Sequence, residues 1–323
     1  MRWLSGFICC CLAWSCVAGP VALYGHRGAA GLAPENTLPA YDTALRLGVD
    51  VVDMDVGMTK DGVVVVSHDL ALNPAFTTDP EGMPVPADKL YIKDLTFAEL
   101  QRYDVGTLNK STEYAKQFPN QIAIPNTHIP RLEAVIDYVN KRSNGKVRFQ
   151  IELKTDPSQP DATVSPEQLA KAVVDVVQQT GVADKVEIHS FDWRGLQAIK
   201  QLDPSIKLSY LTDFTWYNGI LAQDPKQAAL WYAGHKVDTD PKTTLKLIKQ
   251  LGGNVWCANY EDITPALVKQ AHDLGLEVVV WSVDAVPDMV RMSDAKVDGI
   301  ITNRPDVLRG VMAVRKEPLS KAY

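Results

Sequence analysis

Short apolar runs alternate with longer amphipathic stretches along most of the chain, and this alternation limits the fold more than any other feature. Several helical patterns start at a capping residue before proline, as at Ser165, or end at glycine, as at Gly48. Repeated strand–helix units predict a parallel sheet with right-handed crossovers, and eight units favour a closed (β/α)8 TIM barrel in the α/β class. The eight expected strands are Val21–Gly25, Val49–Val56, Val147–Leu153, Val186–Ser190, Lys207–Leu211, Asn254–Cys257, Glu277–Ser282 and Gly299–Thr302.

A further apolar run, Val63–Ser67, follows the second strand too closely to be a barrel strand. The segment Thr59-Lys60-Asp61-Gly62 separates the two, and Asp-Gly between apolar residues is typical of a two-residue hairpin turn. We therefore expect an antiparallel arm on the second strand. A two-residue turn places Asp55 opposite His68 and brings that histidine back beside the carboxylates of the strand.

The segment of about residues 71–128 also interrupts the alternation. It holds clusters of Pro, Thr, Asp and Lys around one helical pattern, Thr96–Tyr103. We predict a small insertion at the top of the barrel, not a separate domain, because loops on that face form the active sites of barrel enzymes.

The first 18 residues differ from the rest of the chain. One basic residue, Arg2, precedes a short apolar stretch with small residues at Cys16 and Ala18, as in a secretory signal peptide. The stretch is short for a membrane span of about 20 residues. We expect residues 1–18 to be removed near Ala18, so that the barrel domain is residues 19–323 and is exported to a periplasm or secreted. A buried first helix and a lipoprotein anchor on Cys16 are lesser alternatives.

Charge and cysteine content narrow the function further. The chain has 33 Lys and Arg against 39 Asp and Glu, a formal net charge of −6, so a general basic surface for nucleic acid is absent. Beyond residue 18 the sole cysteine is Cys257, which excludes an intramolecular disulfide there and indicates a buried small apolar residue. No stable membrane span is expected once the signal is removed.

Polar residues gather at the carboxyl ends of the first three strands. Asp53, Asp55 and Glu152 offer only oxygen, which suits a hard cation such as Ca²⁺ or Mg²⁺. His26 and His68 can serve as general acid and base near neutral pH. The remaining members are basic: Arg27, whose fork matches phosphate oxygens, and Lys154, a point charge. Together these residues predict attack on a phosphodiester.

A series of short motifs extends from Tyr24 to Pro305. They are Tyr24-Gly25-His26-Arg27-Gly28, Pro34-Glu35-Asn36-Thr37, Asp53-Met54-Asp55, Thr59-Lys60-Asp61-Gly62, Ser67-His68-Asp69, Ile151-Glu152-Leu153-Lys154, Ser190-Phe191-Asp192, Val280-Trp281-Ser282-Val283 and Asp298-Gly299-Ile300-Ile301-Thr302-Asn303-Arg304-Pro305. This series resembles the glycerophosphodiester phosphodiesterase family of TIM-barrel phosphodiesterases. The resemblance implies hydrolysis of glycerophosphodiesters to sn-glycerol 3-phosphate and an alcohol.

The resemblance also implies roles for individual residues. Its catalytic histidines correspond to His26 and His68, and its metal-binding acids to Asp53, Asp55 and Glu152. Arg27 corresponds to the arginine at the phosphate. The remaining matches are Glu35, the acid of a turn beside the metal, and Trp281, an aromatic residue lining the glycerol pocket.

The chain departs from the family pattern at three positions. Asp53 stands where Glu is usual and is shorter by one methylene, which favours Ca²⁺ over Mg²⁺ because Ca²⁺ tolerates irregular, partly hydrated shells. Asn303 replaces a common acid, and Arg131 a common Thr. Neither change is interpreted as a loss of activity.

Three alternatives stay open at this point. One is a lysophospholipase D-like enzyme acting on lipids, for which Leu90-Tyr91-Ile92 is the one apolar hint. The second is a barrel phosphodiesterase specific for inositol lipids, and the third is a non-catalytic binding protein of the same fold. His189, at the end of the fourth strand, either lines the pocket or makes a local hydrogen bond.

Overall fold

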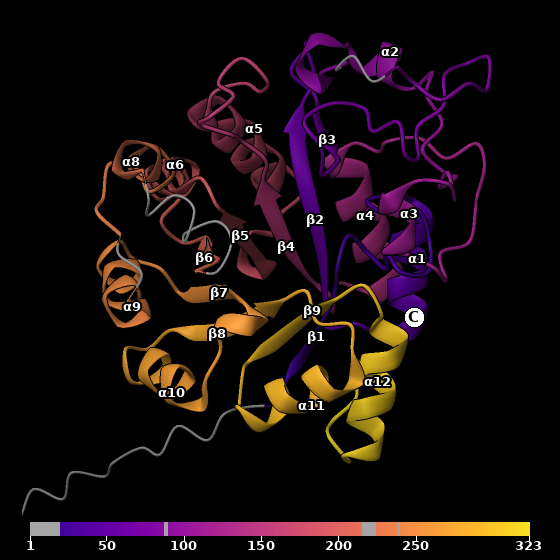
Figure 1. The fold of residues 1–323 in the computed structure, drawn as a ribbon. Coiled ribbons are helices and arrows are strands. Elements are labelled where there is room, and N and C mark those ends of the chain that lie inside the picture. Colours follow the sequence, from indigo (N-terminus) through magenta and orange to yellow (C-terminus); the bar gives the residue numbers. More distant parts are fainter. Residues whose placement is uncertain (1–19, 87–89, 215–223, 238–239) are drawn as a thin grey trace, which may run out of the picture.

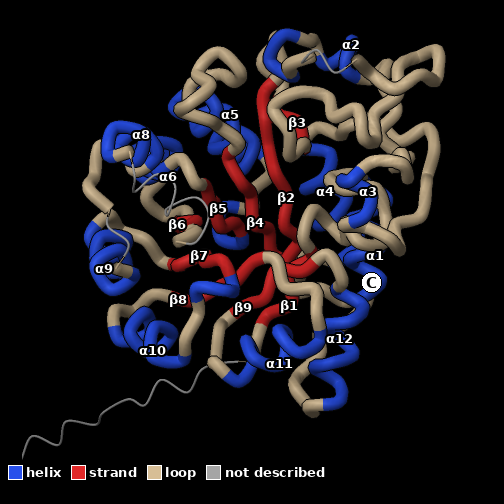
Figure 2. Tube along the Cα trace, in the orientation of Figure 1, coloured by secondary structure: helices blue, strands red, loops and turns tan. Residues whose placement is uncertain are grey.

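The computed structural model describes residues 20–86, 90–214, 224–237 and 240–323. Within these residues, parallel strands close into a barrel with helices around it (Figures 1 and 2). Closure follows from β1 (Ala22–Gly25), which pairs in parallel with both β2 (Val51–Met58) and β9 (Gly299–Thr302). The strands between them are β4 (Arg148–Leu153), β5 (Val186–Ser190), β6 (Lys207–Thr212), β7 (Val255–Asn259) and β8 (Glu277–Trp281). The predicted (β/α)8 TIM barrel is confirmed.

Helices connect the strands and cover the outside of the barrel. The Ser165 hydroxyl accepts from the backbone N–H of Gln168 at the start of α5, and Gly48 ends α1 with a left-handed φ of 70°. The longer helices are α1 (Leu38–Leu47), α4 (Leu132–Ser143), α5 (Pro166–Gln179), α6 (Trp193–Leu202), α8 (Pro225–Trp231), α9 (Pro241–Gln250), α10 (Pro265–Asp273), α11 (Val286–Asp294) and α12 (Pro305–Val314). Short turns are η1 (Ile92–Asp94), α2 (Phe97–Leu100), α3 (Glu113–Lys116), η2 (Ala183–Lys185) and η3 (Tyr260–Asp262).

Two apolar regions hold the barrel together. The larger lies between strands and helices and includes the fully buried Phe149 and Trp193. The smaller fills the barrel interior, where Tyr24, Val255 and Cys257 pack with their neighbours. Cys257 is thus a buried apolar residue, as predicted.

The hairpin arm is present, but its register differs from the prediction. β3 (Val64–Val66) runs antiparallel to β2 and pairs Val56 with Val66, which leaves a three-residue loop of Lys60, Asp61 and Gly62. Gly62 has a φ of +81°, whereas Asp61 does not enter the left-handed region that a two-residue turn of this kind would demand. The prediction that Asp55 lies opposite His68 was wrong, because the Ser67 N–H donates to Asp55 O at 2.9 Å instead.

The described parts of segment 71–128, residues 71–86 and 90–128, contribute no barrel strand and form a lobe beyond the end of β2 (Figure 1). A small apolar cluster holds it on Val65 of the arm, through residues such as Leu72, Ile92 and Leu100. The expected helix Thr96–Tyr103 is shorter and spans Phe97–Leu100. The chain leaves the helical path after it because Asp104 makes two backbone hydrogen bonds with Thr78.

The expected signal, residues 1–18, lies outside the described residues. In the part of the chain that is described, none of the helices combines the length and apolar character needed to span a membrane.

The three-residue loop predicts a specific cost at Gly62. A Cβ there would meet nothing within 4 Å, so Gly62→Ala should act through its left-handed backbone alone and lower the free energy of unfolding by about 1 kcal/mol. Urea unfolding of the variant measures this change. Gly57→Ala, in the same hairpin and also in open space, is the matched control and should not destabilise. Equal stabilities of the two variants would contradict the loop assignment.

Candidate active site

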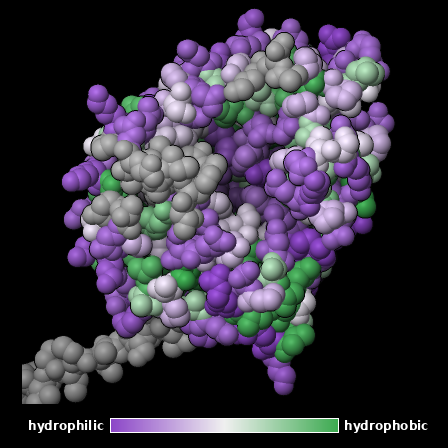
Figure 3. All heavy atoms as spheres, viewed as in Figure 1, coloured by the Kyte–Doolittle hydropathy of each residue, from purple (hydrophilic) through white to green (hydrophobic). Residues whose placement is uncertain are grey.

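A cavity of about 140 Å³ lies at the carboxyl ends of the strands. Figure 3 shows this face of the molecule hollowed near its centre, where hydrophilic residues line the depression. The lining residues are His26, Arg27, Asp53, His68, Glu152, Lys154, His189, Phe191, Leu211, Trp281, Ser282 and Ile301. Two predicted site residues, Asp55 and Glu35, are not among them and contact Arg27 from behind.

Strand register explains why side chains far apart in the sequence meet here. The β2–β4 pairing aligns Asp55 with Glu152, and the β4–β5 pairing aligns Glu152 with His189. Residues aligned across a parallel sheet point to the same face. All three side chains therefore lie at one level near the top of the barrel interior.

Arg27 follows β1 and is held in a buried ionic network. Its Nη1 lies 2.8 Å from Glu35 Oε1 and donates to the hydroxyl of Tyr114 at 3.1 Å, while its Nε lies 3.4 Å from Asp55 Oδ2. Burial alone would lower the pKa of Arg27, but Glu35 and Asp55 outweigh it and raise the pKa well above its ordinary value. Tyr114 belongs to α3 of the insertion and also donates to Glu35, so the insertion is tied directly to this network.

Asp55 is buried and remains ionised. Burial would raise its pKa, but the charges of His68, Lys154 and Arg27 hold the pKa far below its usual range. The side-chain amide of Asn36 donates to Asp55 Oδ2 at 2.8 Å. Asn36 adopts a left-handed φ of 57°, which lets the turn before α1 present its side chain to β2.

Lys154 places a positive charge between two carboxylates. Its Nζ donates to Glu152 Oε1 at 2.8 Å and lies 3.8 Å from Asp55 Oδ1. Burial lowers the pKa of Lys154, but Glu152 and Asp55 together raise it above its ordinary value. The Lys154 ammonium group thus occupies a position where Glu152 Oε1 and Asp55 Oδ1 both face a positive charge.

Asp53 faces a histidine that the sequence analysis left undecided. His189 Nε2 lies 3.2 Å from Asp53 Oδ1, close enough for an ion pair but not aligned as a hydrogen bond. Burial lowers the pKa of His189, but Asp53 outweighs this effect and the net pKa is raised. Asp53 Oδ2 also accepts the Arg27 backbone N–H at 3.2 Å. His189 thus lies in the pocket lining.

The two predicted catalytic histidines are oriented by different partners. His26 Nδ1 lies 2.6 Å from the Asn303 side-chain oxygen, which is neutral. His68 Nδ1 lies 2.9 Å from the Asp69 carboxylate, which Asn73 also holds at 2.6 Å. Burial, reinforced by the neighbouring Arg27 charge, lowers the pKa of His26 below its ordinary value.

One wall of the cavity is apolar. Phe191 and Trp281 make an edge-to-face contact with ring centroids 5.4 Å apart, and Leu211 and Ile301 complete this wall. Trp281 therefore lies where the resemblance places an aromatic residue, although the glycerol contact stays a prediction.

Several residues of the site escaped sequence analysis. Tyr114 lies in the insertion, Asp69 and Asn36 support other side chains by hydrogen bonds, and Phe191 directly follows β5 as an ordinary apolar residue. Asn36, Asp69 and Phe191 belong to the motifs that carry the family resemblance, and this was their signal in the sequence. Tyr114 had no such signal.

The three predicted metal-binding acids do not form a ready cation site. Among residues 20–86, 90–214, 224–237 and 240–323, no three His, Cys, Asp or Glu side chains are arranged to hold a metal ion. Asp53, Asp55 and Glu152 each contact a basic side chain instead. As carboxylates around one cavity they still have the chemistry that suits a hard cation.

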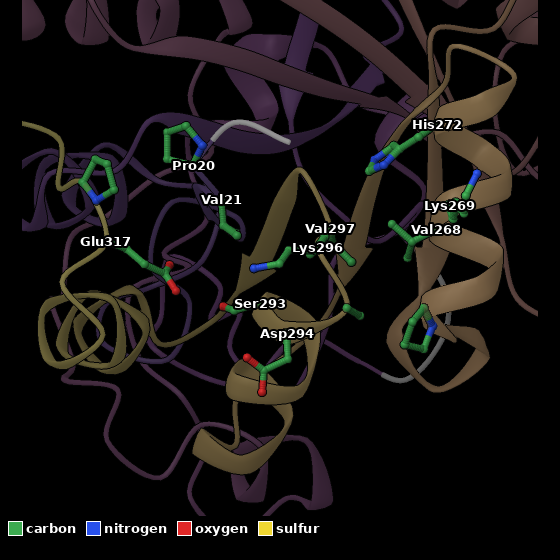
Figure 4. Close-up of a pocket in the computed structure, with 13 residues that line it drawn as sticks. Pro20, Val21, Val268, Lys269, His272, Ser293, Asp294, Lys296, Val297 and Glu317 are labelled. Carbon is green, nitrogen blue, oxygen red and sulfur yellow. The ribbon is translucent and has the colours of Figure 1, made fainter. Parts of the chain in front are cut away.

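A larger cavity, of about 630 Å³, opens at the other end of the barrel (Figure 4). Its lining comes from the segment before β1, from α10, from the end of α11 and the α11–β9 connection, and from Glu317 and Pro318 after α12. His272 there is paired with Asp298 at 2.8 Å, and Asp298 also accepts the Val278 N–H. Size alone does not make it the active site, because barrel enzymes use the opposite face.

The chain is similar to known proteins of one enzyme family. The model of the glycerophosphoryl diester phosphodiesterase family matches residues 26–307. A glycerophosphodiester phosphodiesterase of Caldanaerobacter subterraneus subsp. tengcongensis is 27% identical over 291 residues, which cover 90% of this chain and 96% of that protein. One of Bacillus subtilis is 28% identical, covering 88% of this chain and 84% of the relative.

Solved structures show the same fold. A provisionally assigned glycerophosphoryl diester phosphodiesterase from Silicibacter pomeroyi is 32% identical with a TM-score of 0.82, covering 94% of this chain and 96% of that one. A phosphodiesterase of Oleispira antarctica, solved with the product sn-glycerol-3-phosphate, is 18% identical with a TM-score of 0.66, covering 91% and 97%. On the family match over most of its length, the chain belongs to the glycerophosphoryl diester phosphodiesterase family of enzymes.

Proposed function

We propose that this enzyme hydrolyses glycerophosphodiesters to sn-glycerol 3-phosphate and an alcohol, with a divalent cation and two histidines. The observation that carries the proposal is the convergence of His26, His68, Arg27 and Lys154 on one small cavity beside three carboxylates. The product complex of the Oleispira antarctica protein supports the same product here.

The cation would be held by Asp53, Asp55 and Glu152, with Ca²⁺ favoured and Mg²⁺ possible because Asp53 is short. When bound, it supplies Lewis-acid stabilisation of charge on the phosphate oxygens. Lys154 now neutralises Glu152 and Asp55, so a cation at these oxygens would free its ammonium group for the substrate phosphate. Arg27 presents a guanidinium whose orientation is held by Glu35.

The unequal partners of the histidines suggest unequal roles. Burial of the His26 ring and the nearby Arg27 charge lower its pKa and favour the neutral imidazole, which can accept a proton from water or from the glycerol 2-hydroxyl. The Asp69 carboxylate beside His68 Nδ1 orients that ring, and a histidine placed in this way can donate a proton to the leaving alcohol. We therefore assign His26 as base and His68 as acid.

The lipase alternative is not supported by a specific feature. Ile92 is buried and Leu90 packs against the same insertion cluster, so Leu90-Tyr91-Ile92 is not an exposed apolar rim. Export to a periplasm or to the medium remains part of the proposal and depends on residues 1–18.

Metal removal tests the cation requirement. Treatment with EDTA should abolish release of glycerol 3-phosphate from glycerophosphocholine, and Ca²⁺ should restore it more fully than Mg²⁺ because Asp53 leaves room for a hydrated shell. Calorimetric titration of both ions into the chelated protein measures binding separately from turnover. Full turnover in the chelated, metal-free protein would refute the cation requirement.

Replacement of both histidines tests the proton-transfer roles. Each single alanine variant should lower kcat by about 10²- to 10⁴-fold, and His26→Ala with His68→Ala should remove measurable turnover while circular dichroism shows a folded protein. His128→Ala is the matched control, because His128 is exposed, lies outside the cavity lining and bonds the Tyr103 carbonyl. Substantial activity in the double variant would overturn the assignment.

The pH profile tests which histidine is the base. His26 accepts a proton only when neutral, and its pKa is lowered from 6.5, so the acid limb of kcat/KM should have its midpoint below pH 6.5. The assay is run at saturating Ca²⁺ throughout, with circular dichroism at each pH as the control for folding. A midpoint at or above pH 6.5 would contradict the assignment of His26.

A further inference from the structure

Asp284, in the loop after β8, is fixed by three hydrogen bonds from the end of β9. Its Oδ1 accepts the Thr302 hydroxyl at 2.9 Å and the Asn303 backbone N–H at 2.8 Å. Its Oδ2 accepts the side-chain Nδ2 of Asn303, also at 2.8 Å. The carboxylate is therefore immobilised against the residue that contacts His26.

This contact decides which way the Asn303 amide points. A carboxylate only accepts hydrogen bonds, so the NH₂ group of Asn303 must face Asp284 and the amide oxygen must face His26. The amide oxygen can only accept in turn. His26 Nδ1, at 2.6 Å, must therefore carry the proton, and the Ser282 hydroxyl at 3.3 Å can accept from the same nitrogen.

We propose that Asp284 and Asn303 are positioning residues that hold neutral His26 as the Nδ1–H tautomer and leave the Nε2 lone pair for the cavity. The consequence for turnover rests on the proposed function, because it assumes that His26 is the base. The tautomer itself does not depend on that function. We call the hydrogen-bonded series Asp284–Asn303–His26 the relay. The ring of His68 has no intervening amide of this kind, since Asp69 contacts it directly.

The relay can be inverted by one isosteric change. In Asp284→Asn the new NH₂ group would face Asn303, while the oxygen keeps its bonds from Thr302 and the Asn303 backbone. Asn303 would then turn its oxygen toward position 284 and its NH₂ toward His26. That arrangement demands the opposite tautomer, with the proton on Nε2.

A second change should restore the first. In the double variant Asp284→Asn, Asn303→Asp, the carboxylate now at position 303 accepts both from the amide now at position 284 and from His26 Nδ1. The pair of functional groups is exchanged between the two positions with almost no change in volume. The Nδ1–H tautomer is therefore expected again.

Long-range ¹H–¹⁵N NMR of the ¹⁵N-histidine-labelled protein reads the tautomer directly, with His26 assigned by its absence in His26→Gln. Above the pKa of His26, the wild type and the double variant should show Nδ1 as the protonated nitrogen, and Asp284→Asn should show Nε2. Asp284→Asn should lower kcat on glycerophosphocholine by about 10²-fold or more with little change in KM, and the double variant should recover to within about tenfold of wild type. Asp288→Asn is the control, because Asp288 pairs with Arg291 at the surface, and it should change neither readout.

The outcomes separate the two proposals. A protonated Nε2 in the wild type, or an unchanged tautomer in Asp284→Asn, would overturn the relay. Failure of the double variant to restore the tautomer would do the same. The wild-type spectrum decides even where a variant fails to fold. The expected tautomers without turnover in any protein would refute the proposed function and leave the relay standing.

Discussion

The site depends on burial of one guanidinium group at the end of the first barrel strand. A buried charge is costly unless it is paired and hydrogen-bonded, and Arg27 is 9% exposed. Its partners come from three places: Glu35 from the turn before α1, Asp55 from β2 and Tyr114 from the insertion. The need to neutralise Arg27 therefore joins the barrel and the insertion at the active face.

The same balance of charge links structure to the proposed chemistry. Carboxylates at the top of the barrel are stabilised by basic side chains, with Lys154 lying between Glu152 and Asp55. In the proposed reaction, a divalent cation and a phosphate diester would bring opposite charges into this cluster of carboxylates and basic side chains.

The two histidines show how a common side chain acquires separate properties. His26 is half-buried and faces a neutral amide, whereas His68 follows β3 and faces a carboxylate. Their partners differ because Asn303 belongs to the last barrel strand's end and Asp69 to the segment that follows the arm. Position in the fold, more than residue type, distinguishes the proposed base from the proposed acid.

By itself the sequence determined the barrel, because the alternation of apolar runs and helical patterns can be read from neighbouring residues. It also determined most of the cavity lining, because polar residues at the carboxyl ends of parallel strands meet on one face. It misplaced the hairpin register by one residue, since the loop conformation at Gly62 sets that register. Only the tertiary structure decided that Tyr114 braces Arg27 and that Asp284 orients Asn303 against His26. These contacts join residues far apart in the chain, and no local pattern encodes a hydrogen bond between them.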